Sequence, residues 1–194
     1  MANILKETVR GFDKIAIEDE LLAGREIFLT EEVNAATANE LLKQLMYLEN
    51  QSSDEITLYI NSPGGDVTSG IAVYDYISIM RAPVRTVCIG TAASMGAILF
   101  LAGRKRLMLP RTRVMIHDPS FSRHDIGGHK SHQIQRELEE LNKIREMLAQ
   151  IISDRTGKSL DEIYEVTADD SFYNAAEAIE FGLATGIYDS TDNV

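Results

Sequence analysis

An α/β fold is predicted for this chain of 194 residues, and three observations support it. Short apolar segments with strand character alternate along the chain with longer segments whose apolar residues recur at helical spacing. No low-complexity linker interrupts this alternation. The length suits one domain with its own hydrophobic core, so we expect residues 1–194 to form a single domain.

The predicted strands are short runs rich in apolar and β-branched residues. One of them, EITLYINS, is closed by the turn signal Pro63-Gly64-Gly65. The predicted strands are EIFLT (26–30), EITLYINS (55–62), VRTVCIG (84–90), KRLMLP (105–110) and RVMIH (113–117).

The predicted helices cover residues 34–50, 67–80, 94–103 and about 130–155. The last of these carries a long apolar stripe formed by Ile134, Leu138, Leu141, Ile144, Met147, Leu148, Ile151 and Ile152. Two further helices are indicated by capping boxes, Ser159 with Glu162 and Asn174 with Glu177.

Composition and charge limit the classes of function. The net charge is −11 and basic residues are not clustered, so nucleic acid is not an expected partner. The single cysteine, Cys88, lies in an apolar run, which excludes a disulfide within the chain and favours a reducing, cytoplasmic setting. The first 14 residues lack the apolar core of a signal peptide, and GAILFLAG is too short to span a membrane, so no membrane association is expected.

The stretch GTAASMGAILFLAG (90–103) places Ser94 at the predicted start of an apolar helix. Unpaired amides and the helix dipole favour negative charge at that end, which suits a nucleophile and an oxyanion. The alternative is that Ser94 only caps the helix. This stretch alone favours the cap, because N-cap serines are far commoner than nucleophilic ones.

A second glycine site lies in NSPGGDV (61–67). Without side chains, Gly64 and Gly65 allow their amides to approach a ligand closely. An amide here, together with that of Met95, could form an oxyanion hole with two donors. The alternative is an ordinary Pro-Gly turn, which this motif alone favours.

His117 is the candidate base, because it ends an apolar strand just where the chain reaches the surface. A buried structural histidine is the alternative. The other histidines, His124, His129 and His132, lie in the polar stretch SRHDIGGHKSHQ and are expected to face water. His129 and His132 could share a helix face, but no further Cys or His completes a metal site, so no metal is expected.

The sequence defines a candidate acid, the group that would orient the histidine, less clearly than it defines the candidate nucleophile and base. Asp169 and Asp170 in TADDSF lie between the two capped helices, in a loop that could reach His117. Solvated acids that merely flank a helix are the alternative.

The chain order Ser, His, Asp differs from that of α/β-hydrolases and of the chymotrypsin and subtilisin types. The order and the motifs resemble the proteolytic subunit of the Clp protease, from LLAGREIFL near residue 21 to EFGLATGIYD at 180–189. Five segments carry the resemblance in order: LYINSPGGDVTSGIAVYD, GTAASMGAILFLAG, LPRTRVMIHDP, RTGKSLDEI and AAEAIEFGL.

The resemblance implies a role for each candidate residue. Ser94 matches the nucleophile, His117 the base and Asp170 the orienting acid, while Gly65 and Met95 match the oxyanion donors. An extended polypeptide substrate would lie along strand edges near 65–68 and 119–126, and the residues expected to bind it are Gly64, Asp66, Val67, Asp118 and Pro119.

The resemblance also implies an architecture and partners. The fold would be a crotonase-like spiral of ββα units, with residues 1–19 as an axial-loop segment and residues 118–156 as a projecting handle of strand and helix. Copies of the chain would form heptameric rings stacked in pairs. An AAA+ unfoldase of the ClpX, ClpA or ClpC type would feed substrate, and a paralogous Clp subunit is a further possible partner. The chain itself would need no cofactor, because ATP is used by the unfoldase.

Three departures from the family pattern stand out. The usual HQP and glycine-rich strand are replaced by HDPSFSRHDIGGHK, which is about four residues longer, and the segment between Ser94 and His117 is about two residues shorter. The Asp-Arg pair that joins the rings in the family is Ala168-Asp169 here. A divergent second copy that works with a more typical subunit is therefore an open alternative.

Two other classes of function stay open. One is a catalytically weak or regulatory ring subunit, which the complete Ser94, His117 and Asp170 set opposes. The other is a crotonase-type acyl-CoA enzyme, which would not need a serine matched to a histidine. A serine–lysine signal-peptide peptidase would need a lysine facing Ser94, and the sequence offers no clear candidate.

Overall fold

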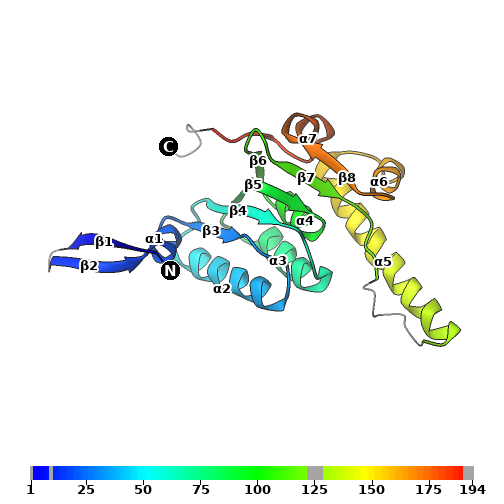
Figure 1. The fold of residues 1–194 in the computed structure, drawn as a ribbon, viewed down its shortest axis with the longest axis horizontal. Helices are drawn as coiled ribbons and strands as arrows, with labels where there is room; N and C mark the ends of the chain where they lie inside the picture. The colour runs from blue at the N-terminus through cyan, green and yellow to red at the C-terminus, as the bar shows by residue number, and fades with distance from the viewer. Residues whose placement is uncertain (1, 9–10, 122–128, 190–194) are drawn as a thin grey trace.

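The computed structural model describes residues 2–8, 11–121 and 129–189, and its strands and helices alternate along the chain. Figure 1 shows a twisted sheet with helices packed against it, a hairpin that extends from one end and a long helix that extends from the other. The α/β fold class predicted from the sequence is confirmed.

Within the described residues the main sheet has seven strands, five of which run parallel in the order β3-β4-β5-β6-β9. Their bounds are Glu26–Leu29 (β3), Ile56–Ser62 (β4), Val84–Ala93 (β5), Lys105–Met108 (β6) and Gly186–Ile187 (β9). The other two, Arg113–Ile116 (β7) and Ser171–Asn174 (β8), pair with each other in antiparallel, and β7 also pairs with β5 in parallel.

Strand β5 pairs with two different strands along the same edge, first with β6 and then with β7. Its residues Arg85–Cys88 pair with β6, whereas Thr91–Ala93 pair with β7. The sequence predicts that this strand ends at Gly90, but pairing with β7 extends it to Ala93. Strand β5 therefore delivers Ser94 to the same edge of the sheet at which β7 ends.

Three helices pack in succession below the sheet in Figure 1: α2 (Ala35–Gln51), α3 (Val67–Ile79) and α4 (Met95–Leu101). Asn34 caps α2 in a box with Thr37. Every residue of α4 is buried, which explains why this short helix is apolar throughout. The core is built around it from the buried faces of the neighbouring strands and helices, including Leu45, Leu58, Ile60, Val73 and Ile163.

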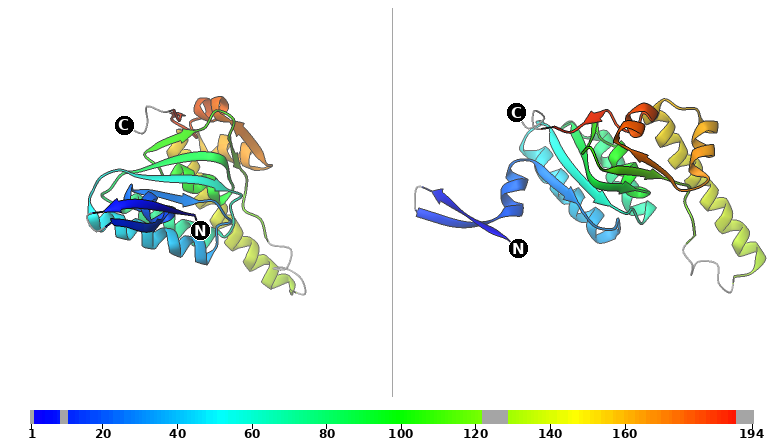
Figure 2. Two further views of the ribbon diagram at one scale, coloured as in Figure 1. Left: turned by 60° about the vertical axis from the view of Figure 1, so that its left-hand side comes forward. Right: turned by 45° about the horizontal axis from the view of Figure 1, so that its top comes forward.

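Helix α5 (Ser131–Thr156) is the projecting handle. Its C-terminal half packs on the core through Leu148, Ala149 and Ile152, whereas Ile134 and Leu138 are exposed. Both views of Figure 2 show its N-terminal half extending away from the sheet. The predicted handle strand is absent from residues 118–121, and residues 122–128 lie outside the described part of the chain.

Both predicted capping boxes are confirmed, at the starts of α6 (Leu160–Thr167) and α7 (Ala175–Phe181). The Ser159 amide donates to the Glu162 carboxylate at 3.0 Å, and the Asn174 amide donates to that of Glu177 at 2.8 Å. These caps set the ends of the segment that contains β8.

The N-terminal segment forms an antiparallel hairpin of β1 (Asn3–Thr8) and β2 (Gly11–Ala16), followed by α1 (Ile17–Ala23). The sequence indicates only a weak mixture of apolar and charged residues here, so the hairpin is a structural feature that the pattern did not reveal. Leu5 and Phe12 are exposed, and Lys6 forms an ion pair with Glu20 of α1 at 2.7 Å. The hairpin therefore stands clear of the core (Figure 1).

None of the helices in the described residues combines the length and the apolar character needed to cross a membrane.

Candidate active site

Ser94 occupies the N-cap position of α4 in a backbone conformation that is unusual for a serine. Its φ of 53° and ψ of −122° lie in a region that favours glycine, at a cost of about 1–3 kcal/mol. Its side chain makes no capping hydrogen bond. The interpretation of Ser94 as a simple helix cap is therefore wrong, and the strained turn directs its hydroxyl elsewhere.

The Ser94 hydroxyl lies beside His117, and His117 lies beside Asp170. His117 Nε2 is 2.9 Å from Ser94 Oγ, and its Nδ1 is 2.8 Å from Asp170 Oδ1. An ionised carboxylate only accepts hydrogen bonds, so Nδ1 carries the proton and Nε2 of the neutral ring accepts from the serine hydroxyl. This is the tautomer in which a histidine can receive a proton from that hydroxyl.

Three strands bring these residues together. Strand β5 ends immediately before Ser94, β7 ends immediately before His117, and β8 begins immediately after Asp170. The last pair of the β7–β8 ladder is Ile116 with Ser171, so the next residue on each strand is His117 and Asp170. The Ser94 amide also donates to the Met115 carbonyl at 2.9 Å, which ties the serine to β7.

The register of β8 distinguishes the two neighbouring aspartates. Spacing in the sequence leaves Asp169 and Asp170 as alternatives, because β8 is not evident in its pattern. The structure places Asp170 within hydrogen-bonding distance of His117, with the Asp170 side chain 60% exposed and that of His117 29% exposed. The acid is thus partly open to solvent.

The glycine turn lies against the serine. A Cβ on Gly64 would come within 2.6 Å of both the Ala93 carbonyl oxygen and Ser94 Cβ, and its φ is +94°. Only glycine allows the turn to approach the serine so closely.

Whether the amides of Gly65 and Met95 can act as the predicted oxyanion donors depends on whether other hydrogen bonds use them. Ser62 Oγ accepts from the Gly64 amide at 3.2 Å, while none of the hydrogen bonds recorded for the described residues uses the amide of Gly65 or Met95. Strand-type hydrogen bonds between Val33 and the turn, Val33 N to Gly64 O at 2.8 Å and Asp66 N to Val33 O at 2.7 Å, hold Gly65 in place. The recorded hydrogen bonds therefore leave both amides of the predicted donor pair without a partner.

A small apolar pocket adjoins Ser94 and His117, with a volume of about 30 Å³. Its inner wall, which is not among the predicted site residues, comes from the core faces of α4 and α5. Ile98 lies one helical turn after Ser94, and Leu148 and Ile152 belong to the predicted apolar stripe. Their spacing in the sequence could therefore have indicated an apolar wall beside the serine. The lining residues are Val67, Ser94, Met95, Ile98, Ile116, His117, Pro119, Leu148 and Ile152.

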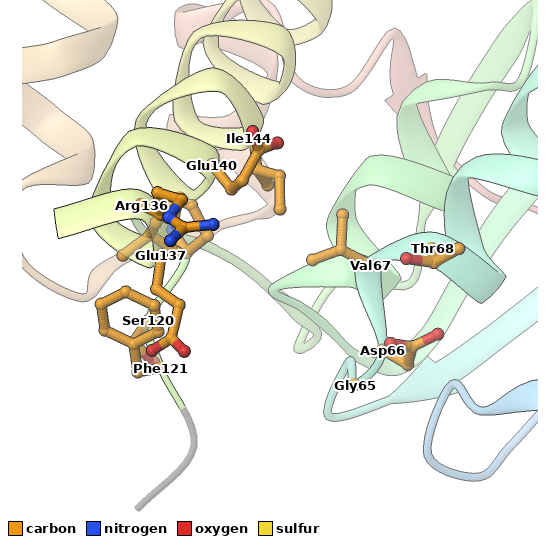
Figure 3. Close-up of a pocket in the computed structure, with 12 residues that line it drawn as sticks. Gly65, Asp66, Val67, Thr68, Ser120, Phe121, Arg136, Glu137, Glu140 and Ile144 are labelled. Atoms are coloured by element: carbon orange, nitrogen blue, oxygen red, sulfur yellow. The ribbon is translucent and has the colours of Figure 1, made fainter. Parts of the chain in front are cut away.

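A larger cleft of about 760 Å³ separates the start of α3 from the handle helix. Figure 3 shows Gly65, Asp66, Val67 and Thr68 on one side, and Arg136, Glu137, Glu140 and Ile144 of α5 on the other. Asp66 caps α3 by accepting from the Ser69 hydroxyl and amide, and these hydrogen bonds lower the pKa of its carboxyl group. Pro119, Ser120 and Phe121 also line the cleft.

The residues predicted to bind substrate fall into two groups. Asp66, Val67 and Pro119 line the larger cleft. Gly64 and Asp118 line neither of these two cavities: Gly64 packs on the serine turn, and the Asp118 side chain is bonded to Arg145 and Thr167.

The remaining histidines lie elsewhere. His129 pairs with Glu137 through a contact of 2.8 Å, and His124 lies outside the described residues. Among the residues that the structure describes, no group of three or more His, Cys, Asp or Glu side chains could hold a metal ion.

In a comparison with protein families, the family model described as Clp protease matches residues 10–191, which is nearly the whole chain.

Proposed function

Because the chain belongs to the Clp protease family, we propose that it is the serine endopeptidase subunit of a self-compartmentalising, ATP-dependent protease. The observation that carries this proposal is the continuous line from Ser94 Oγ through His117 to Asp170, with contacts of 2.9 and 2.8 Å. Its substrates would be unfolded polypeptides and peptides.

In the first half of the reaction, Ser94 Oγ attacks the carbonyl carbon of the scissile peptide bond while His117 Nε2 takes the hydroxyl proton. The tetrahedral intermediate collapses as the C–N bond breaks, and His117 returns the proton to the leaving amine. The product is an acyl-enzyme on Ser94. Asp170 keeps His117 in the required tautomer and stabilises its cation.

In the second half, water replaces the leaving amine. His117 takes a proton from the water, the hydroxide equivalent attacks the acyl carbon, and the proton returns to Ser94 Oγ as the carboxylic product leaves. No atom changes its oxidation state in either half of the reaction. The subunit would require no cofactor, because ATP is used by the partner.

The oxyanion of both tetrahedral intermediates would accept from the amides of Gly65 and Met95. Two features support this assignment: these amides have no partner among the recorded hydrogen bonds, and Met95 is the first residue of α4, where the helix dipole is positive. Loss of one such donor costs about 10²–10³ in rate in comparable sites.

Substrate would lie extended in the cleft between α3 and α5, held by backbone hydrogen bonds near Gly65–Thr68. Backbone recognition is consistent with broad specificity. The small pocket beside Ser94 is apolar, so a substrate side chain placed there would be apolar too.

Membership of the family implies self-association and association with Clp ATPases. The finer proposal is that heptameric rings stack in pairs through the handles and that an AAA+ unfoldase docks on the assembly. The exposed apolar residues Ile134 and Leu138 on α5 support a role for the handle in contacts between copies.

A second candidate is a weakly active ring subunit that depends on a typical paralogue. Asp169, which stands where the family resemblance expects a ring-joining arginine, is the observation that favours it.

Substitution of the serine tests the proposal. Ser94→Ala should abolish cleavage of a fluorogenic peptide and leave the assembly seen by native mass spectrometry unchanged, since it removes one oxygen from a partly buried side chain. Full activity in Ser94→Ala would exclude the serine peptidase mechanism.

A further inference from the structure

Asp118, the residue directly after His117, uses both of its carboxylate oxygens in contacts with other elements. Its Oδ1 accepts from the Thr167 hydroxyl at 2.6 Å, and its Oδ2 accepts from Arg145 Nε at 2.6 Å. The Asp118 side chain is 26% exposed and that of Arg145 37% exposed, so the ion pair is partly shielded from solvent. Charge-assisted hydrogen bonds of this length are the strong ones.

The backbone of Asp118 reinforces the same connection. Its amide donates to the Thr167 carbonyl at 2.7 Å, so Asp118 and Thr167 are joined twice. The Thr167 hydroxyl also lies 2.9 Å from the Ile163 carbonyl, but it has a single proton, and the charged carboxylate is both nearer and the stronger acceptor.

Arg145 brings the handle helix into this cluster. Its guanidinium lies 4.5 Å from the centroid of the Tyr164 ring, which fixes the arginine against α6. The arginine therefore reaches from α5 to Asp118 in a defined direction, and the cluster joins α5, α6 and the end of β7.

These contacts enclose the His117–Asp170 pair. On one side the β7–β8 ladder ends at Ile116 and Ser171. On the other side, two hydrogen bonds join Asp118, one residue after His117, to Thr167, three residues before Asp170. The pair lies in a short loop that is fastened at both ends, and the Ser171 hydroxyl also donates to the Val166 carbonyl at 2.6 Å across this loop. These contacts matter because the Asp170 side chain is 60% exposed.

From this arrangement, and resting on the proposed function, we propose that Asp118 is a positioning residue for catalysis: by clamping Thr167, with Arg145 holding its second oxygen, it keeps His117 and Asp170 at their working distance. The resembled family usually has glutamine at this place, which could not form the ion pair. Asp118 would not touch the substrate through its side chain.

The test uses the full-length chain and two pairs of variants. Asp118→Ala removes the side-chain contacts to Thr167 and Arg145 and keeps the backbone hydrogen bond to Thr167. Thr167→Val removes only the hydroxyl, whereas Thr167→Ser keeps it. Glu49→Gln is the matched control, because Glu49 also accepts from an arginine residue, the Arg81 backbone amide at 2.7 Å, and forms an ion pair with its side chain. That pair lies at the C-terminal ends of α2 and α3, about one length of α3, or ~20 Å, from the serine.

Hydrolysis of a fluorogenic peptide gives kcat and KM, and titration with a fluorophosphonate probe counts the reactive serines. We expect kcat per titrated site to fall about 10–100-fold in Asp118→Ala and Thr167→Val, with KM changed less than about threefold, because small misplacements of catalytic groups act on the chemical step. Thr167→Ser should stay within about threefold of the parent, and Glu49→Gln should match it.

A merely structural role for Asp118 would lower the number of titrated sites and leave the turnover of each site unchanged, and this result would overturn the inference. A change confined to KM would also overturn it and would return Asp118 to peptide binding. If the parent protein itself fails to label at Ser94, the proposed function fails; if it labels and the variants turn over normally, only the positioning role fails.

Discussion

At the scale of single residues, local chemistry marks Ser94 and His117 as candidates only. The stretch around Ser94 alone favours a helix cap, and the catalytic roles are implied by the ordered motifs of the family resemblance. Ser94 was suggested by small neighbours at the start of an apolar helix, and His117 by its place at the end of a strand. The strained backbone of Ser94, with φ of 53°, has no signal in the neighbouring residues, and the Gly64 turn that lies against it is distant in the sequence. The choice of Asp170 over Asp169 depends on a strand register that has no signal in either residue.

The two aspartates give a matched comparison. Asp170→Asn should lower kcat strongly, because an amide can donate to His117 and thereby favour the wrong tautomer. Asp169→Asn should change kcat only mildly, since the contact to His117 is made by Asp170. Steady-state hydrolysis of a small peptide measures both. The reverse order of effects would assign the role to Asp169.

The glycine turn gives a second comparison. Gly64→Ala should abolish peptide hydrolysis, because its Cβ would collide with the Ala93 carbonyl and the Ser94 side chain at 2.6 Å. Gly157→Ala is the control: its φ of +76° is equally unfavourable for alanine, but nothing lies within 4 Å of the added Cβ. It should lower the free energy of unfolding by about 1–2 kcal/mol and keep activity. Equal activity of the two variants in a peptide assay, with both folded by circular dichroism, would refute this account of the turn.

At the scale of elements, strong patterns were predicted and weak ones were missed. The capping boxes at Ser159 and Asn174 and the apolar stripe of α5 follow from local spacing, and the structure has all three. Strand β8 was missed because it is only four residues long and alternates in exposure at the edge of the sheet. The N-terminal hairpin was missed because it pairs with itself and buries little, so its sequence carries no core-facing pattern.

The hairpin is the element whose function is easiest to separate from catalysis. Its exposed Leu5 and Phe12 place apolar side chains in solvent, at the end of the molecule opposite the handle (Figure 2). Deletion of residues 2–9 should leave hydrolysis of small peptides intact and reduce or abolish degradation of a folded protein driven by an unfoldase and ATP. Equal loss of both activities would mean that the hairpin supports the fold.

At the scale of the whole molecule, the fold class and the family are predictable because several motifs occur in a fixed order along the chain. The resemblance also implies stacked rings, but the sequence does not predict how stably the copies assemble. Contacts between copies depend on surface charge and on the segment after His117, much of which lies outside the described residues. The subunit carries a net charge of −11, and Asp169 stands where the resemblance places an arginine that pairs across the rings.

Assembly should therefore depend on salt. Loss of one charge-assisted contact costs about 1.5–3 kcal/mol, and a symmetric ring repeats that loss in every copy. We expect the isolated protein to occupy single rings or a mixture of single and double rings with low activity. Added salt should favour the double ring by screening repulsion, as should a typical paralogue that supplies the arginine. Native mass spectrometry at low and high ionic strength, with peptidase assays, tests this. A fully active double ring at low salt without a partner would contradict it.

The most direct test of the central claim is chemical labelling of the nucleophile. The parent protein is treated with a fluorophosphonate probe, digested and mapped by mass spectrometry, with Ser94→Ala and a heat-unfolded sample as controls. We expect the label on Ser94 alone. Within the described residues, only this hydroxyl lies 2.9 Å from a histidine that is in turn hydrogen-bonded to an aspartate. We also expect both controls to remain unlabelled. A label on another residue of the parent protein, or undiminished labelling of Ser94→Ala, would contradict the central claim.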